Sequence, residues 1–468
     1  MTPATTPGAG LPRLPGHEVP AGSAAGAGAP EGSLRPRVAR ALLVAGAIVA
    51  AVAAAAYVAA LATHPWKSLL NGFDLQVYLG GAREALHHAA NLYSWHYRHD
   101  LGIQFTYTPF AALLFAGGLA VPFQLLMGLV SAAGAFGLAA TGWIALRELG
   151  WRSLPARAGA TLLVTGLAFW TEPVQRALYL GQVELVMMAL IVWDMCQPDR
   201  RRWKGAVLGV TAGIKLVPLL FIVYLLVTRR FRQAAVACAA FAATVVIGFA
   251  ALPRPSVSWW LKLNFLQAGR TGFVGDQQNQ SLRGIVTRLV GSVAAGQLPW
   301  LAVAIVVGLA GLAAAVTLHT SGRSYGPFAG LLTCSLTALL VSPISWDHHW
   351  VWIAPAVALF ASLGAHARRA ARAGWLGLAG LVLVSYGAWP DFWRPGAGLL
   401  QGGLINYAPA AVFAHGDNPA YPEYHWTSLQ ALAGNLYLLG GCLLFAVALV
   451  AAARLWRAQR AAMRCSPA

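Results

Sequence analysis

The sequence predicts an all-α protein that crosses a membrane many times. Hydrophobic residues make up 58% of its 468 positions and charged residues only 10%. Apolar runs recur along the chain at close to the ~20 residues that a helix needs to span a bilayer. Within lipid, the backbone polar groups have to be satisfied inside the chain, and a helix does this. We expect roughly 10 to 13 membrane segments, with interfacial helices in the first outer loop.

The formal net charge of +18 does not indicate nucleic-acid binding. The basic residues lie in short groups between apolar runs, as at Arg200 to Arg202 and at Arg368, Arg369 and Arg372. This distribution is typical of cytoplasmic loops and of contacts with anionic headgroups, so membrane lipid is the expected partner and nucleic acid is not. The five cysteines are scattered and predict neither a metal site nor a disulfide framework.

Both ends of the chain are expected on the cytoplasmic side. Residues 1–34 are rich in Ala, Gly, Pro, Ser and Thr without periodicity, which predicts a disordered tail. The apolar run Ala41–Thr63 follows several arginines, so it should enter the membrane from the cytoplasm and leave Asp74 outside. Residues 35–460 are expected to form one transmembrane domain, followed by a short cytoplasmic tail at 461–468.

Other polar segments are expected on the same outer face as Asp74. Counting spans backward from the basic C-terminal end places the turn at Gly181-Gln182, residues 277–283 and residues 342–349 outside the membrane. The sequence therefore predicts a multi-pass protein of the plasma membrane with its active site on the extracytoplasmic side.

Two apolar stretches are expected to contain broken helices. Basic residues flank Gly205–Val227 on both sides, and Gly213 and Pro218 bracket Lys215 in its middle, which favours two half-helices in a hairpin. Residues 107–146 are too long for one span, and we expect a break near Pro122. Discontinuous helices are tolerated in membranes where they line a cavity.

Asp74 is the first candidate for chemistry. Aspartate and glutamate together number only 15, so an acid at the membrane boundary is by default a functional hypothesis. It begins an amphipathic stretch that contains Tyr78 and ends near Leu92-Tyr93. Asp74 could serve as a general base held at the interface, or it could cap the N-terminus of a helix.

The segment Ser342–Trp350 is the second concentration of polar side chains, with Trp346, His348 and His349. Neighbouring histidines point in different directions on a helix, and no His-x-x-x-His or Cys-x-x-Cys spacing is present, so we expect no zinc site. The histidines could bind a phosphate or a sugar hydroxyl, or transfer a proton. An interfacial cluster of aromatic and histidine side chains is the alternative.

Two basic residues are candidates for binding a phosphate. Arg283 follows Asn279 and Gln280 on an outer loop, and its planar guanidinium offers paired donors. It could equally be a surface arginine near lipid headgroups. Lys215 stands inside an apolar run, where it would either extend to the membrane surface or serve as a buried counter-charge.

Gln182 and Glu184 follow an outer turn and could line a sugar pocket or cap a helix. No glycine-rich phosphate loop and no Asp-x-Asp motif is present, so a nucleotide-binding site of the usual types is not predicted. We expect neither a cofactor nor a metal. A lipid-linked donor would be compatible with a site outside the cytoplasm.

An ordered series of short motifs resembles glycosyltransferase family 87, the polyprenyl-phosphate-mannose-dependent α-1,2-mannosyltransferases of the membrane-embedded GT-C class. The motifs are Asp-x-x-Val-Tyr at Asp74–Tyr78, Leu92-Tyr93, Tyr-x-Pro-Phe at Tyr107–Phe110, Gly181-Gln182-Val183, Ala-Gly-Ile-Lys-Leu-x-Pro at Ala212–Pro218, Asn-Gln-Ser-Leu at Asn279–Leu282, and Ser-Pro-Ile-Ser-Trp-x-His-His at Ser342–His349. They extend over roughly residues 70 to 365. Glu184 stands where the family commonly has asparagine.

The resemblance implies a GT-C-like fold and an inverting transfer of mannose from a polyprenyl-phosphate-linked sugar donor. The acceptor would be a hydroxyl of a cell-envelope glycolipid or polysaccharide, and the new bond an α-(1→2) linkage. Asp74 would be the catalytic base, with His348 or His349 also at the reacting centre. The leaving phosphate would be stabilised by Arg283 and Lys215. Sugar and acceptor binding would involve Tyr78, Gln182, Glu184, Asn279, Gln280 and Trp346.

The aromatic segment Trp389–Trp426 is expected to cover the site, and its rings could stack on sugars or form an interfacial belt. Two other functions remain open. A related polyprenyl-phosphate pentosyl- or hexosyltransferase would share these motifs. A lipid or solute transporter, with Lys215 and Arg283 lining a passage, would be expected to show internal repeats, and we find no convincing repeat.

Overall fold

The computed structural model describes residues 36–63, 69–97, 103–389, 402–411 and 414–465. The predicted tail at 1–34 therefore lies outside the described residues. The first half of the chain forms α1 (Pro36–Thr63), α2 (Phe73–His87), η2 (Ala89–Asn91), β1 (His96–Tyr97), β2 (Ile103–Gln104), α3 (Pro109–Ala116), η3 (Gly117–Ala120), α4 (Phe123–Glu148), α5 (Leu154–Ala168), α6 (Glu172–Leu180), α7 (Glu184–Met195), α8 (Ala206–Ile214), α9 (Leu219–Val227) and α10 (Phe231–Ala251).

The second half continues the helical pattern. It forms α11 (Pro253–Ser256), η4 (Val257–Leu261), η5 (Asn264–Leu266), η6 (Ala268–Thr271), α12 (Leu282–Val290), α13 (Gln297–His319), α14 (Gly326–Val341), η7 (Asp347–Trp352), α15 (Ile353–His366), α16 (Arg369–Ser385), β3 (Ala388–Trp389), β4 (Gly402–Gly403), η8 (Leu404–Tyr407), η9 (Pro422–Tyr424), α17 (Ser428–Gly434) and α18 (Leu436–Cys465). The strands form two short antiparallel pairs, β1 with β2 and β3 with β4. The predicted all-α class is confirmed. Helix α18 continues into the segment predicted as a tail from residue 461.

Five helices among the described residues are long and apolar enough to cross a membrane, namely α1, α4, α10, α13 and α18. The pair α6 and α7 passes the same test together but bends by 114° between its two helices. These are fewer than the roughly 10 to 13 membrane segments expected, because other apolar stretches form helices shorter than the ~20 residues of a full span. The chain is an integral membrane protein.

Both predicted helix breaks are present. Helix α8 ends at Ile214, and the extended backbone of Lys215 separates it from α9, which begins after Pro218. In the earlier stretch, α3 and the 3-10 turn η3 end before Pro122, and α4 follows it. Proline and glycine account for both breaks, because they interrupt the helical hydrogen-bond ladder or allow the chain to leave it.

The buried side chains form two apolar clusters. The larger one lies within the helix bundle and contains fully buried rings such as Trp350, Tyr386 and Tyr437. The smaller one joins α2 to α3 and η4 through Tyr78, Phe105 and other apolar side chains. This second cluster fixes α2 against the bundle and so determines where Asp74 lies.

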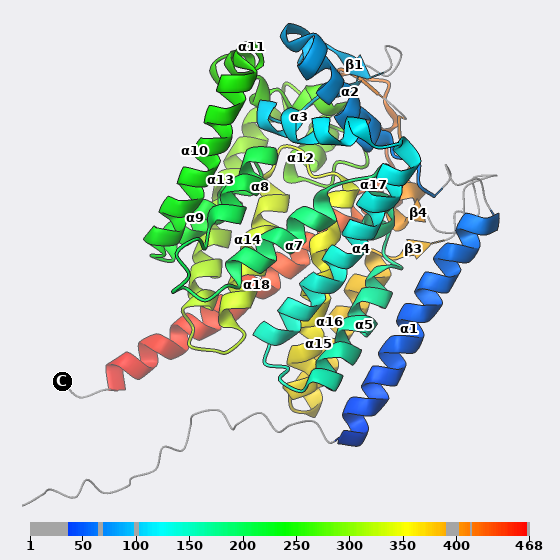
Figure 1. Ribbon diagram of the computed structural model, residues 1–468. Helices are drawn as coiled ribbons and strands as arrows, with labels where there is room; N and C mark the ends of the chain where they lie inside the picture. Colours follow the sequence, from blue (N-terminus) through cyan, green and yellow to red (C-terminus); the bar gives the residue numbers. More distant parts are fainter. Residues whose placement is uncertain (1–35, 64–68, 98–102, 390–401, 412–413, 466–468) are drawn as a thin grey trace, which may run out of the picture. The chain divides into compact units, whose positions relative to one another are not determined.

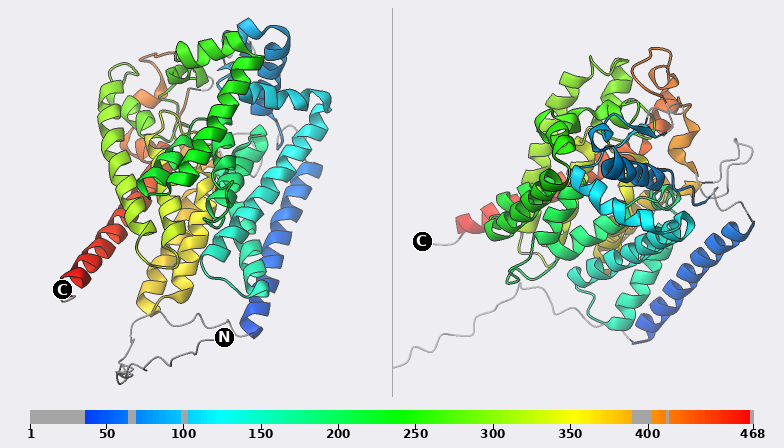
Figure 2. Two further views of the ribbon diagram at one scale, coloured as in Figure 1. Left: turned by 60° about the vertical axis from the view of Figure 1, so that its left-hand side comes forward. Right: turned by 45° about the horizontal axis from the view of Figure 1, so that its top comes forward.

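The polar loops gather at one end of the bundle. Figure 1 shows α2, β1 and α11 together at this end, away from the start of α1 and the end of α18. The views in Figure 2 show the same arrangement, with the ends of α1 and α18 that carry basic residues at the opposite side. This placement agrees with the order of sides inferred from the basic residues.

Candidate active site

A large cavity lies among these loops and contains most of the predicted site residues. Its volume is about 1470 Å³. The predicted residues that line it are Asp74, Tyr78, Gln182, Lys215, Trp346, His348 and His349. They come from four separate parts of the chain, namely α2, the turn between α6 and α7, the break between α8 and α9, and the segment formed by Trp346 and η7. The fold therefore brings distant polar motifs to one site.

Asp74 occupies the first turn of α2 but does not cap it. The N-cap is Gly72, whose φ of 66° suits glycine, and no side chain caps the helix there. The N–H of Gly72 donates to the carbonyl of Tyr179 at 2.8 Å, which joins the start of α2 to the end of α6. The capping alternative for Asp74 is thus wrong, and its carboxylate instead accepts a hydrogen bond from the Gln182 amide.

The surroundings of Asp74 shift the pKa of its carboxyl group in opposite directions. Burial raises the pKa of Asp74 above the ordinary value of an aspartate, because the charged carboxylate loses solvation. The nearby His348, Arg176 and Lys215 and the hydrogen bond from Gln182 act in the other direction, and burial prevails. The group is thus a stronger base than an exposed aspartate when it is ionised, as a general base requires.

Gln182 is the central residue of the site. Its Nε2 donates to Asp74 and lies 3.0 Å from Nε2 of His348, while its Oε1 accepts a hydrogen bond of 2.5 Å from the hydroxyl of Tyr78. The preceding Gly181 has a φ of 70°, which ends α6 and turns the chain toward α7. Because all its polar atoms have partners, the buried Gln182 amide is held in one orientation.

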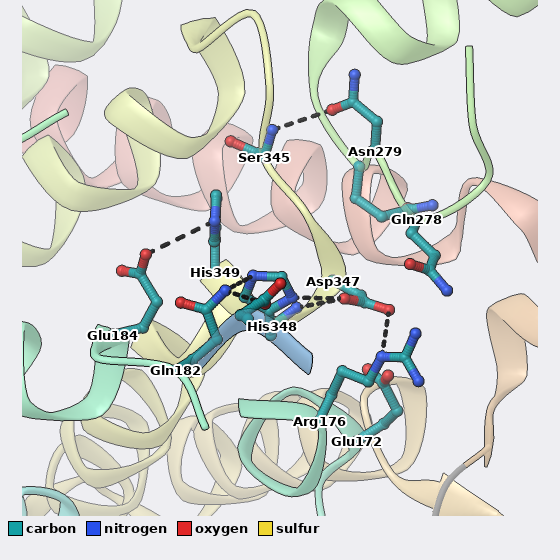
Figure 3. Close-up of polar contacts among 12 residues, drawn as sticks. Glu172, Arg176, Gln182, Glu184, Gln278, Asn279, Ser345, Asp347, His348 and His349 are labelled. Atoms are coloured by element: carbon teal, nitrogen blue, oxygen red, sulfur yellow. Dashed lines mark hydrogen bonds and ion pairs between the residues drawn. The ribbon is translucent and has the colours of Figure 1, made fainter. Parts of the chain in front are cut away.

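His348 continues this network toward the interior. Its Nδ1 lies 3.1 Å from Oδ1 of Asp347, and Oδ2 of Asp347 lies 3.8 Å from Nε of Arg176 (Figure 3). A carboxylate can only accept a hydrogen bond, so the proton on Nδ1 of His348 faces Asp347. Sequence reasoning missed Asp347 and Arg176. The charged pair Glu172 and Arg176, four residues apart on α6, was the available signal.

Lys215 belongs to a second polar group beside the first. Its ammonium donates to Glu184 and lies 2.9 Å from Nε2 of His349. It also lies 5.6 Å from the centre of the Tyr107 ring. Burial and the nearby Lys215 and His348 lower the pKa of His349 well below its usual range, so His349 is neutral and accepts from Lys215. Glu184 lines a small neighbouring cavity of about 40 Å³ rather than the main one.

Besides Glu184, three predicted residues lie outside the main cavity. Asn279 and Gln280 bind backbone groups instead, because the Asn279 side chain accepts from the N–H of Ser345 at 3.0 Å and the Gln280 amide donates to Gly434. Both residues fix the loop before η7, where Asn279 also pairs with Trp346 in a β-bridge. Their expected contact with sugar is not seen in this geometry.

Arg283 is the third of these residues. Its guanidinium lies over the ring of Trp300 on α13, 4.9 Å from the ring centre. Arg283 lies on α12, and its side chain is buried against α13 rather than among the residues that line the cavity. Contrary to the expectation, Arg283 is not placed to contact a phosphate beside Asp74.

Other parts of the cavity wall were not predicted. One part is apolar and includes Leu216, Leu220 and Val341. Another is polar and includes Arg270 and Asp276, and burial raises the pKa of Asp276 to about 7.

The predicted covering segment Trp389–Trp426 reaches the cavity at Asn406, Ala410, Ala411, Ala414 and His415. Its residues 390–401 and 412–413 lie outside the described residues. Among the described side chains, no group of three or more His, Cys, Asp or Glu residues could hold a metal ion.

Comparisons with known proteins point to one family. The model described as Glycosyltransferase family 87 matches residues 105–343. A Mycolicibacterium smegmatis protein named polyprenol-phosphate-mannose-dependent alpha-(1-2)-phosphatidylinositol pentamannoside mannosyltransferase is 33% identical over 357 residues, covering 72% of this chain and 83% of that protein. A Mycobacterium tuberculosis protein of the same name is 34% identical, covering 70% and 76%. A second one from that species, named for phosphatidylinositol mannoside, is 31% identical, covering 67% and 75%. Comparison with solved structures gave no match.

Proposed function

This chain belongs to glycosyltransferase family 87, and from that premise we propose that it transfers mannose from polyprenyl-phosphate-mannose to a cell-envelope glycolipid. The transfer inverts the sugar and forms an α-(1→2) linkage. The acceptor is a phosphatidylinositol mannoside or a glycolipid of that class, as the names of the relatives suggest. The reaction takes place at the extracytoplasmic face of the plasma membrane, with residues 1–34 and the C-terminal end in the cytoplasm.

The observation that carries this proposal is the way Asp74 is held in the cavity. An acceptor hydroxyl beside its carboxylate would give up a proton to Asp74 as the acceptor oxygen attacks C1 of the donor mannose. The bond between C1 and the phosphate oxygen then breaks, and the phosphate leaves with the electron pair. Gln182 keeps the carboxylate in one orientation, which such a proton transfer requires.

The leaving phosphate is stabilised by Lys215. An ammonium has three N–H donors, and Glu184 and His349 take two of them. The third is available to a phosphate oxygen in the cavity that Lys215 lines. Fixed positive charge next to a developing anion lowers the barrier without a metal ion. The apolar wall at Leu216, Leu220 and Val341 suits the hydrocarbon chain of the donor.

The test compares two variants of acidic residues on the same helix. Asp74→Asn is expected to lower kcat by about 10²- to 10⁴-fold, because it removes the base but preserves the shape of the side chain. Glu84→Gln is the matched control, since Glu84 also lies on α2 but pairs with His88 at 3.6 Å outside the cavity. Both are purified, reconstituted in lipid and supplied with radiolabelled polyprenyl-phosphate-mannose and phosphatidylinositol mannosides.

If the kcat of Asp74→Asn is within threefold of that of the wild type, Asp74 is not the base of the reaction. A wild-type protein that transfers pentose or another hexose in preference to mannose would support the related transferase instead. If it moves lipids across the bilayer and transfers no sugar, the transporter alternative is favoured.

A further inference from the structure

The cavity contains a second set of cationic and hydrogen-bonding groups that the reaction above does not use. Arg270 of η6 lines the cavity together with the neighbouring Thr271 and with His415 from the loop after η8. Among the residues that the structure describes, no carboxylate acts on the Arg270 guanidinium, and Tyr93 is the ionisable side chain that does. Arg270 thus differs from Lys215 and Arg176, both of which face carboxylates.

The Arg270 guanidinium is held in place by a tyrosine. It donates from Nη2 to the carbonyl of Tyr93 and lies over the Tyr93 ring, 5.6 Å from its centre. Its Nε is buried and has no acceptor within the described residues. A fixed guanidinium with unused donors presents a fork that matches the oxygens of a phosphate.

A histidine with an unused nitrogen approaches from another loop. The N–H of Phe273 donates to the carbonyl of Ala414 at 3.1 Å, which places His415 beside the segment that carries Arg270. Nε2 of His415 is buried without a partner among the described residues. Burial lowers the pKa of His415, and the nearby His96 acts in the same direction. His415 thus offers an unused ring nitrogen in the same cavity as Arg270.

Two tyrosines connect this set with Lys215, which we assign to the leaving phosphate. The hydroxyl of Tyr93 donates to the carbonyl of Tyr107 at 2.9 Å, while its own carbonyl, at the other end of the residue, binds Arg270. Lys215 in turn lies over the Tyr107 ring. Arg270 and Lys215 thus each contact a different tyrosine of this hydrogen-bonded pair.

We propose that Arg270, with Thr271 and His415, binds a phosphate that the acceptor carries apart from its reacting hydroxyl. The inference rests on the proposed function, because it presumes sugar transfer at Asp74. It adds to that function a place in the cavity for the phosphate of the phosphoglycolipid acceptor. The cavity then holds two phosphates, one that leaves with the prenyl chain and one that stays on the acceptor.

The test measures how the enzyme distinguishes two acceptors. The full chain is placed in phosphatidylcholine nanodiscs with saturating polyprenyl-phosphate-mannose, and KM is measured for a phosphatidylinositol mannoside and for a neutral alkyl α-mannoside. Arg270→Gln should raise the KM of the phosphatidylinositol mannoside relative to that of the neutral mannoside by about 10- to 100-fold. This is the range for one charge-assisted hydrogen-bonded pair. Arg270→Lys should restore part of the difference, since it keeps the charge but not the fork.

Lys262→Gln is the matched control, because Lys262 is an exposed cation on the same outer segment and does not line the cavity. It should leave the ratio of KM values as in the wild type. Soluble glycerophosphoinositol should inhibit transfer to the phosphoglycolipid by the wild type. In Arg270→Gln, most of this inhibition should be lost.

An equal rise in both KM values, or a rise in the KM of the donor, would overturn the inference by placing Arg270 at the donor or in the fold. Competition by phosphatidylglycerol as effective as that by glycerophosphoinositol would also overturn it, because the site would then bind bulk membrane lipid. A wild type that uses neither acceptor would contradict the proposed function itself.

Discussion

The side-chain nitrogen of Gln182 lies 3.0 Å from Nε2 of His348 and also donates to the carboxylate of Asp74. Each of its two hydrogens has one acceptor, so the amide joins the proposed base to the histidine segment. Because Gln182 acts through Asp74, we regard it as a positioning residue rather than a catalytic one. Its removal should therefore affect the chemical step more than the binding of substrates.

Gln182→Leu is expected to lower kcat by about 100-fold and to change the KM of the donor less than threefold. The reason is that a base displaced by about 1 Å loses roughly this factor. Single-turnover transfer of radiolabelled mannose measures the chemical step directly. A change confined to KM would show that Gln182 binds sugar and does not orient Asp74.

Gln182→Glu has a different expected result, because it places a second carboxylate against Asp74. Two adjacent carboxylates raise the pKa of at least one of them. The acidic limb of the kcat/KM profile should therefore move to higher pH, while the rate at high pH recovers relative to Gln182→Leu. An unmoved limb would mean that residue 182 and Asp74 do not interact during the reaction.

The pH dependence of the wild type follows from the raised pKa of Asp74. The base has to be ionised, so kcat/KM should fall as the pH is lowered through a value above the ordinary 3.8 of an aspartate. Lys215 opposes this shift, since its charge favours the carboxylate. Lys215→Met should thus move the limb to still higher pH. A profile measured from roughly pH 4, near the ordinary pKa of aspartate, to about pH 9 would reveal this movement.

Asp74 also has a predicted effect on stability. A carboxyl group with a pKa raised in the folded state contributes stability below its unfolded pKa and loses it as the pH rises through the folded pKa. At neutral pH the buried charge is therefore unfavourable. The Tm of Asp74→Asn should be at least that of the wild type at pH 7, and the difference should disappear toward pH 4. A lower Tm at pH 7 would show that the carboxylate stabilises the fold.

The sequence predicted the parts of the site that depend on local signals. The breaks beside Lys215 and near Pro122 follow from proline and glycine, and the helix that starts at Phe73 follows from its amphipathic pattern. The prediction that Asp74 and the segment around His348 lie on the same side of the membrane came from basic residues alone, since these determine the side of each loop.

Long-range pairing explains what the sequence did not predict. The sequence predicted Asn279 as a sugar ligand, but its side chain accepts a hydrogen bond from the backbone N–H of Ser345. No local sequence pattern indicates such a contact. Arg176 on α6 reaches Asp347 on η7, a pairing between distant parts of the chain that hydropathy does not encode. Arg283 was assigned from its residue type, which does not say whether it faces the cavity or the Trp300 ring.

Lys215 and Glu184 form an ion pair, and variants of the two residues distinguish the effect of this pair on stability from the effect of Lys215 on catalysis. Their side chains are 20% and 13% exposed, so each charge is largely removed from water and needs the other. Lys215→Met and Glu184→Gln should each lower the free energy of unfolding by about 3 kcal/mol, and the double variant by less than the sum. Thermal and denaturant unfolding in detergent would measure this coupling.

The two variants should differ in activity. Lys215→Met removes the cation beside the leaving phosphate and should lower kcat by about 100-fold. Glu184→Gln keeps the cation and leaves the third N–H of Lys215 available to the phosphate, so its kcat should stay within threefold of the wild type. Equal losses of kcat in both variants would contradict the assignment of Lys215 to the leaving group.

The buried Arg288 joins the loop before α12 to the segment before α18. Its guanidinium donates to the carbonyl of Asp276 at 2.8 Å and to the side chain of Asn435 at 2.6 Å, and it lies over the ring of Trp426. A lysine in its place has three donors on one nitrogen and cannot reach both loops at once.

Arg288→Lys should therefore lower Tm by several degrees and expose the segment at 414–426 to proteases, because several buried hydrogen bonds are lost at about 1 kcal/mol each. The KM of the acceptor should rise, since Ala414 and His415 line the cavity on this segment. Arg254→Lys on the exposed part of α11 is the control and should change none of these quantities. If Arg288→Lys has the Tm and protease resistance of the wild type, the guanidinium does not hold the two loops together. The cavity wall would then depend on the apolar contacts of Phe273 with the rings of the covering segment.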